Sequence, residues 1–288
     1  SKLGSIFPNI FNLTRKLSIF KFLSDYVLKI DKRREIPKIA PYSFEKLYKS
    51  DSNGKNKVAI FFHDTFTNYN HPQVGLSAVK ILKSLNYKVK LIDKKCCGRP
   101  LISKGLLGSA KKNALHNIEK LYSHVKEGAI VVGAEPSCIS ALKDEYPDMF
   151  PKDERVNLIS ENTYLLQEII TDPSNSNKIK FKNNLDKKSY AVQVHCHEKT
   201  IIGENASIDS LKLIPNSVVE KIPSGCCGMA GAFGYEKEHY DISKKIAEDR
   251  LIPYINNMKK NTQVAITGVS CRHQIKDFSN QNKIREKI

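Results

Sequence analysis

The chain has 288 residues, of which 40% are hydrophobic and 27% charged, with a formal net charge of +17. This composition is that of a soluble globular chain, and the length allows one large domain or two of ordinary size. No apolar run reaches the ~18 residues of a membrane span, and no signal pattern stands at the start. The lysines are spread along the chain without an aromatic-studded basic motif, so nucleic-acid binding is not expected. We therefore expect a cytoplasmic protein, in which clustered cysteines bind metal more often than they form disulfides.

Residues 1–50 form a segment of their own. Between 13 and 30 the apolar side chains follow helical spacing, with basic residues mostly between them. This pattern predicts an amphipathic helical connector that docks on a partner domain or on its own chain. A peripheral contact with the inner face of a membrane is the alternative, since the positive charge also suits an anionic surface.

Two halves follow, a first repeat domain over 51–172 and a second over 186–288, with a polar linker over 173–185. Strands and helices alternate in both, which predicts an α/β fold of two pseudo-repeated halves, each a small parallel sheet with helices on both faces. The strands are expected at 57–62, 88–93, 128–133, 155–160, 190–195, 217–222 and 263–267. The helices are expected at 72–87, 103–125, 138–146, 161–170 and 236–255.

All seven cysteines fall within one duplicated pattern. The triplet Cys-Cys-Gly occurs at 96–98 and again at 226–228, and each is followed by a further cysteine, Cys138 or Cys271. Cys196 precedes the second triplet, and His63 takes the corresponding place in the first half. Each cysteine lies at or just past the carboxyl end of a predicted strand, the edge at which sites gather in parallel sheets.

Thiolates are soft ligands that suit iron–sulfur clusters and zinc. A [4Fe–4S] cluster requires about four ligands. The second half offers Cys196, Cys226, Cys227 and Cys271. The first half offers Cys96, Cys97 and Cys138, with His63 as a candidate fourth ligand. Spacing alone does not separate a cluster from zinc, so both interpretations stay open.

Other residues near the cysteines suggest supporting roles. Gly225 and Gly228 would let backbone amides approach a cluster, and Arg272 would offset its negative charge. Alternation along a strand would turn His195 and His197 away from Cys196, so we expect them in supporting or surface positions. The sequence has no Ser-His-Asp arrangement, phosphate loop or dinucleotide fingerprint. A flavin or nucleotide site is therefore expected on another domain or chain.

Six phrases of the sequence resemble a known family. They are "HDTFTNYNHP", "CCGRPLISKGLL", "EPSCISALKDEYPD", "HCHEKT", "GCCGMAGAFGYEKEHYDIS" and "SCRHQIKD". Over roughly 36–280 the chain is similar to the cysteine-rich CCG domains in the C-terminal part of FAD-linked D-lactate or glycolate oxidoreductases. It more distantly resembles the CCG-containing subunit of heterodisulfide reductase. In the FAD-linked relatives an FAD domain and a ferredoxin-like cluster domain precede this region.

The resemblance implies an iron–sulfur electron-transfer module of a flavin-dependent 2-hydroxy-acid dehydrogenase, with a quinone or a soluble carrier as acceptor. The family pattern has a cysteine, then Cys-Cys-Gly, then Cys-x-x-Cys in each half. This chain departs from it at His63, Glu135 and Gly268, each at a cysteine position of that pattern. His63 would also fit a first half that binds substrate or serves as scaffold. Two alternatives remain: a heterodisulfide-reductase-like module that acts on a thiol or disulfide, and a zinc-stabilised scaffold that binds a flavoprotein.

Overall fold

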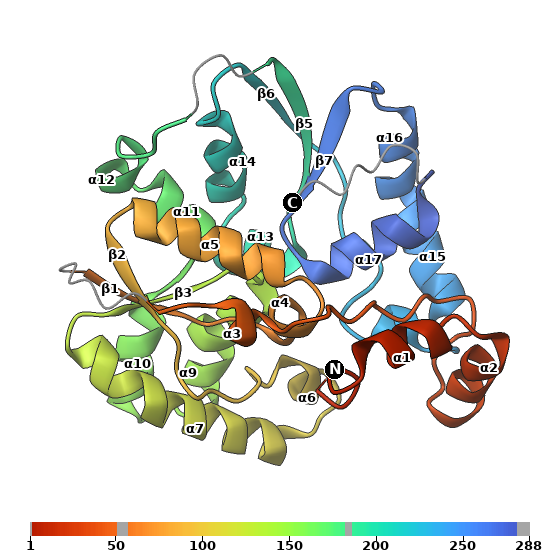
Figure 1. The fold of residues 1–288 in the computed structure, drawn as a ribbon, viewed down its shortest axis with the longest axis horizontal. Helices are drawn as coiled ribbons and strands as arrows, with labels where there is room; N and C mark the ends of the chain where they lie inside the picture. The colour runs from red at the N-terminus through yellow and green to blue at the C-terminus, as the bar shows by residue number, and fades with distance from the viewer. Residues whose placement is uncertain (1, 51–56, 182–185, 281–288) are drawn as a thin grey trace.

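A computed structural model describes residues 2–50, 57–181 and 186–280 of the chain (Figure 1). The predicted linker at 173–185 and the outer ends of the two predicted repeat domains, near 51 and 288, lie partly outside these residues. The described part is α/β with two small parallel sheets, as the alternation of strands and helices predicts.

The first sheet has four parallel strands in the order β2-β1-β3-β4. Its strands are β1 (Lys57–Phe61), β2 (Tyr87–Lys90), β3 (Ile130–Gly133) and β4 (Thr163–Leu165). Successive side chains of a strand point to opposite faces, so Ile60 and Phe61 enter different cores. Both faces are buried, which explains why β1 and β3 read as continuous apolar runs rather than alternating ones.

Helices cover each face of the first sheet. Helices α7 (Leu107–Lys126) and α10 (Glu154–Glu161) pack with the π-helical turn η1 (Ala141–Glu145) on one side. On the other side pack α3 (Phe44–Leu47), α5 (Pro72–Ser84) and α11 (Leu166–Thr171). The remaining helices of this half are short: α4 (Thr65–Tyr69), α6 (Arg99–Ser103), α8 (Pro136–Ser140), α9 (Tyr146–Met149) and α12 (Pro173–Ser176).

The second sheet has three parallel strands in the order β6-β5-β7. They are β5 (Lys188–Gln193), β6 (Ser217–Lys221) and β7 (Thr262–Ile266). As in the first half, the first strand is central and the next two flank it. The helices are α13 (Cys196–Ile201), α14 (Asn205–Lys212), the 3₁₀ turn η2 (Phe233–Tyr235), α15 (Tyr240–Asp249), α16 (Leu251–Asn257) and α17 (Val269–Phe278). Apolar residues of α15, α16 and α17 form the core on one face.

The predicted strand at 155–160 is wrong, because this segment forms α10. The Asp153 carboxylate caps the helix by accepting the N–H of Arg155, and Val156 and Ile159 are buried at helical spacing. The fourth strand instead lies at Thr163–Leu165, inside the predicted helix at 161–170. It is three residues long and pairs with β3, so its pairing rather than any local pattern defines it.

The N-terminal segment contains α1 (Pro8–Thr14) and α2 (Ser18–Val27) and packs against the second half (Figure 1). Ile30 forms an antiparallel bridge with Glu236. The buried Arg34 guanidinium donates to the Gly234 carbonyl at 2.6 Å and pairs with Asp277 at 2.7 Å. Many apolar side chains of α1, α2 and their flanks are exposed, among them Leu13, Ile19, Phe22, Tyr26 and Val27. Within the described residues, no helix has both the length and the apolarity needed to cross a membrane.

Candidate metal centre

Four cysteines of the second half lie at the carboxyl edge of its sheet. Cys196 is the first residue of α13, directly after β5. Cys226 and Cys227 lie in the loop after β6, and Cys271 lies in the first turn of α17, after β7. Because parallel strands end at the same edge, three segments far apart in sequence bring their sulfur atoms together there.

The four sulfur atoms form a connected series. The Cys226 sulfur interacts with the thiols of Cys196 and Cys227, and Cys227 also interacts with Cys271. The interaction with these two thiols holds the pKa of Cys226 well below its ordinary value, and the same interaction raises the pKa of Cys196 and Cys227. The Cys227 and Cys271 side chains are buried, and Cys226 is exposed. Cys227 and Cys271 therefore form the buried part of the site, and Cys226 forms the part that faces solvent.

Backbone amides point at these sulfur atoms. The Gly228 N–H donates to the Cys226 Sγ at 3.3 Å, and the amides of His197 and Met229 donate to Cys196 and Cys227. Gly228 has a φ of +87°, and a Cβ there would lie 2.4 Å from the Ser243 carbonyl oxygen. A Cβ at Gly225 would meet nothing within 4 Å. The loop thus requires glycine at 228 but not at 225.

The first half brings its three cysteines together in the same way. The Cys97 thiol donates to the Cys138 Sγ at 3.1 Å, and Cys96 interacts with Cys97. The Gly98 N–H donates to Cys96 from a residue with a φ of +93°. Both Cys-Cys-Gly loops therefore use a left-handed glycine that directs its amide at the first cysteine of the pair.

His63 does not face these three cysteines. Its ring is 1% exposed, with Nε2 2.8 Å from the Glu45 carboxylate and Nδ1 3.5 Å from the Phe61 carbonyl oxygen. Burial lowers the pKa of His63. Both ring nitrogens are thus directed at oxygen atoms, and ligation by His63, predicted from the sequence, would require the ring to turn.

Two carboxylates approach Cys138 instead. Asp64 is buried and caps α4, with Oδ1 accepting the N–H of Phe66 at 2.7 Å and of Thr67 at 2.9 Å. Glu135 is 7% exposed, and burial together with the charge of Asp64 raises its pKa to about 7. The hydrogen bond from Cys97 lowers the pKa of Cys138, but burial and the charges of both carboxylates outweigh it and raise that pKa. Sequence reasoning did not single out Asp64, although the residue follows directly after His63.

Glu135 also connects the two halves. Its Oε1 accepts the Ser137 hydroxyl at 2.9 Å, and its Oε2 accepts the N–H of Val269 at 3.0 Å. Val269 is the first residue of α17, which carries Cys271. A carboxylate at the amino end of a helix is favourable because it satisfies a free N–H and complements the helix dipole.

His195 and His197 lie between the two halves, and the prediction that strand alternation orients them is wrong. Strand β5 ends at Gln193, and His195 is already the cap of α13. The His195 Nε2 lies 3.5 Å from the Ser137 Oγ, and the His197 Nδ1 lies 3.3 Å from the Ser140 Oγ. Burial lowers the pKa of His195 to about 4.

The His195 ring explains one departure from the family pattern. A Cβ at Gly268 would lie 2.3 Å from the His195 Cδ2, so any side chain at 268 would collide with the ring. The two halves also meet beside the cysteines. His195 and His197, which flank Cys196, contact serines near Cys138, and helix α8 packs against helix α13.

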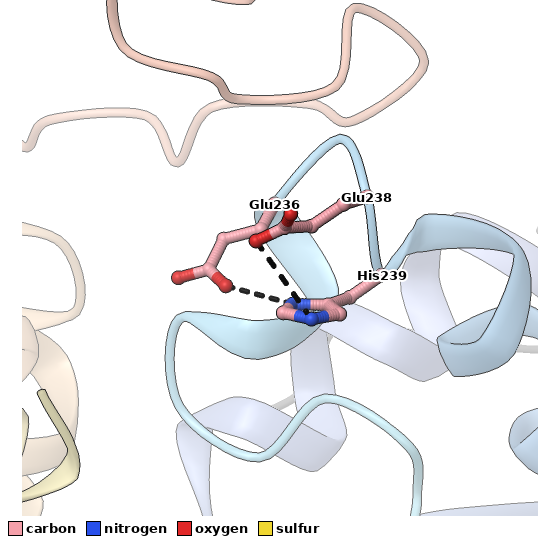
Figure 2. Close-up of side chains that lie close together, drawn as sticks. All are labelled: Glu236, Glu238 and His239. Carbon is pink, nitrogen blue, oxygen red and sulfur yellow. Dashed lines mark hydrogen bonds and ion pairs between the residues drawn. The ribbon is translucent and has the colours of Figure 1, made fainter.

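One further group of metal-binding side chains contains no cysteine and is drawn in Figure 2. The carboxylates of Glu236 and Glu238 and the imidazole of His239 lie within 4.8 Å of one another. The group is already paired: the His239 Nδ1 is 2.8 Å from Glu236, which also contacts Lys104. The His239 ring stacks on Phe233 at 4.1 Å.

Comparison with known proteins assigns one part of this chain to a domain family. The family model described as the CCG cysteine-rich domain matches residues 60–143, from β1 to η1, including three of the cysteines. The chain thus contains a CCG cysteine-rich domain, and the resemblance seen in the sequence is confirmed.

Three similar proteins extend this result beyond the matched residues. A subunit of the anaerobic glycerol-3-phosphate dehydrogenase of Escherichia coli (strain K12) is 33% identical over 253 residues, or 85% of this chain and 63% of the relative. D-2-hydroxyglutarate dehydrogenase of the same strain is 26% identical over 82% of this chain and 23% of the relative. Lactate utilization protein A of Anoxybacillus flavithermus is 25% identical over 63% of this chain and 75% of the relative. The chain thus spans under two thirds of the length of the first two relatives.

Proposed function

We propose that the chain is the iron–sulfur electron-transfer module of a flavin-dependent dehydrogenase that oxidises a 2-hydroxy acid. The observation that carries the proposal is the connected series of Cys196, Cys226, Cys227 and Cys271 at one sheet edge. Four thiols, three of them with backbone amides directed at their sulfur atoms, fit an iron–sulfur cluster, which supplies one-electron transfer when bound. The relatives support this class, since the name of each concerns a dehydrogenase or the use of lactate.

The spacing of the sulfur atoms favours a cluster over a single zinc ion. A tetrahedral zinc site with Zn–S bonds of about 2.3 Å holds its four sulfur atoms roughly 3.8 Å apart. All seven cysteines lie in the described part of the chain, and there no three of their sulfur atoms lie within 4.8 Å of one another. Sulfur atoms that are neighbours in pairs but do not surround a single point suit a cluster with several metal atoms better than one metal ion.

The two halves differ in what they offer a cluster. The second half has four thiols, which suits a [4Fe–4S] cluster. The first half has three, Cys96, Cys97 and Cys138, with the carboxylates of Asp64 and Glu135 near Cys138. The second half is therefore the principal electron-transfer site of the proposal.

The proposed partners follow from this role. Hydroxy-acid oxidation takes place at an FAD on another domain or chain, and a ferredoxin-like cluster domain links the two sites. The acceptor is a quinone or a soluble carrier. The exposed apolar side chains of α1 and α2, beside lysines such as Lys16 and Lys29, provide a surface for docking on these partners or on the inner face of a membrane.

A redox titration monitored by electron paramagnetic resonance tests the proposal. Protein purified without oxygen should show a signal that appears on reduction and disappears on reoxidation. A signal that changes shape only when a small thiol is added would instead favour the heterodisulfide-reductase-like alternative. Protein that gives no signal at any potential and contains zinc would contradict the proposal.

A further inference from the structure

A cavity of about 580 Å³ lies between the two halves. Residues that follow β1, β3 and β4 form the wall on the first half, and β7 with the start of α17 forms the wall on the second. Residues of helix α5 also line the cavity. The cavity therefore lies at the same strand edges as the cysteines, with Glu135 three residues before Cys138 and Arg272 next to Cys271.

The walls of the cavity combine apolar and polar side chains in equal number. Nine side chains provide the apolar part, among them Val74, Ile81, Leu166, Val264 and Ile266. The polar part comes from hydroxyl, amide and charged side chains. An apolar wall that faces convergent polar groups is a feature of small-molecule sites in proteins, and here the polar groups make up half of the lining.

The charges around the cavity are of both signs, and its two buried acids disfavour a strongly anionic ligand. Arg272 and Lys276 lie one turn apart on α17, and Lys276 pairs with Glu35 at 3.3 Å. The carboxylates of Asp64 and Glu135 line the same space from the first half, both almost completely buried. A phosphate or a dicarboxylate would meet these two acids at close range, so the cavity suits a neutral molecule that carries hydrogen-bonding oxygens.

One polar atom on the cavity wall lacks a partner. Among the described residues, the Gln167 Oε1 is one of few buried side-chain oxygens without a hydrogen bond, and Gln167 lines the cavity. Buried acceptors in native proteins are almost always satisfied, so an orphan at a cavity indicates a missing hydrogen-bond donor. A ligand hydroxyl would supply it.

We propose that this cavity binds the head group of a quinone and of its hydroquinone form. The ring would lie against the aliphatic side chains of α5 and β7, and its oxygen atoms would reach the polar groups of Gln167 and α17. This inference rests on the proposed function, because a quinone is one of the two acceptor classes named there. The proposal concerns the binding of a quinone by residues of this chain, so it can be tested without measuring dehydrogenase activity.

Tryptophan fluorescence offers a direct test, because the chain has no tryptophan and one introduced residue becomes the only reporter. Ser77 is exposed at the cavity wall on α5, and Gln73 is exposed on the same helix outside the lining. With 1,4-naphthoquinone as the probe, the fluorescence of the Ser77→Trp variant should be quenched along a saturating curve. The Gln73→Trp variant, the matched control, should show only weak quenching that rises linearly with concentration.

A second substitution tests the role of the orphan amide. Gln167→Leu in the Ser77→Trp background should weaken binding of the reduced probe, 1,4-dihydroxynaphthalene, about fivefold to tenfold, the loss expected for one hydrogen bond. Equal, linear quenching of both tryptophan variants would overturn the inference, and so would saturable quenching by D-lactate but not by the quinone. Iron and sulfide measured on the same sample separate this result from the proposed function, since a sample with a full cluster and no quinone binding refutes only the cavity's role.

Discussion

The Glu135 carboxylate accepts the backbone N–H of Val269 at 3.0 Å and thereby joins the loop before Cys138 to the helix that carries Cys271. The same side chain accepts the Ser137 hydroxyl, so a single buried carboxylate fixes both segments. The family pattern has a cysteine at this position. Its replacement by glutamate exchanges a candidate ligand for a contact between the halves.

Glu135→Gln should lower the free energy of unfolding by about 1–3 kcal/mol. The carboxylate accepts two hydrogen bonds with its two oxygens, whereas the glutamine side chain has one oxygen and an NH2 group that cannot accept. Hydrogen exchange at the Val269 amide should become faster in this variant. The exposed Glu161→Gln on α10 is the matched control and should stay within about 0.5 kcal/mol of the parent in urea unfolding. Unchanged exchange at Val269 would show that the contact between the halves does not depend on the carboxylate.

The two glycines beside the second cysteine pair should differ in their tolerance of a side chain. Gly228→Ala forces a Cβ to 2.4 Å from the Ser243 carbonyl oxygen at a φ of +87°, so it should cost about 1–3 kcal/mol and lower the iron content. Gly225→Ala has open space and should retain the iron. Iron analysis and thermal unfolding of both variants measure this difference. Equal tolerance at the two positions would contradict the described loop.

His63→Gln should leave the iron content of the protein unchanged, because both ring nitrogens of His63 face oxygen atoms and glutamine can maintain the contact with Glu45. Cys97→Ala should lower the iron content, since Cys97 lies at the centre of the first-half thiols. The measurement is iron per chain after preparation without oxygen. Loss of iron from His63→Gln would identify His63 as a ligand and restore the prediction made from the sequence.

Stability should fall as the pH drops below about 6.5. Burial lowers the pKa of His273 to about 3 and that of His195 to about 4, whereas histidines in an unfolded chain titrate near 6.5. Between these values the unfolded chain binds protons that the folded chain does not. Each such histidine therefore removes about 1.4 kcal/mol of stability per pH unit. The raised pKa of Glu135 has the opposite sign and offsets part of this loss between about pH 7 and 4.5.

One histidine can be separated from the rest by substitution. His273→Gln preserves a partner for the Tyr235 hydroxyl, which lies 2.7 Å from the His273 Nδ1. Urea unfolding at pH 6.5, 5.5 and 4.5 gives the free energy of unfolding as a function of pH. The slope of this free energy against pH should be smaller in the variant than in the parent by the amount that corresponds to one proton. Parallel slopes for the parent and the variant would show that His273 is protonated in the folded chain.

The sequence predicts most of the strands, and the convergence of the cysteines at the sheet edges, because the signal for each strand is local. Buried parallel strands appear as short apolar runs, and each cysteine lies at or after the end of such a run, so their convergence follows from the topology. The segment 155–160 fails because Val156 and Ile159 are compatible with a strand as well as a helix. Only the cap at Asp153 and the pairing of Thr163–Leu165 with β3 decide between them.

Contacts between distant segments have no comparable signal in the sequence. Arg34 is one of many basic residues, and nothing near it indicates that Gly234 and Asp277 surround its guanidinium. His195 is similar, because its contact with Ser137 depends on how the halves pack. Glu135 is the exception, since its place in a cysteine pattern singles it out before its partner is known.

The content of iron, acid-labile sulfide and zinc in protein purified without oxygen tests the central claim most directly. We expect about four irons per chain or more, with a matching amount of sulfide, the content of one [4Fe–4S] cluster. A variant with Cys196, Cys226, Cys227 and Cys271 all changed to serine should lose that cluster. Zinc without sulfide in the parent, or iron and sulfide unchanged in the variant, would contradict the account.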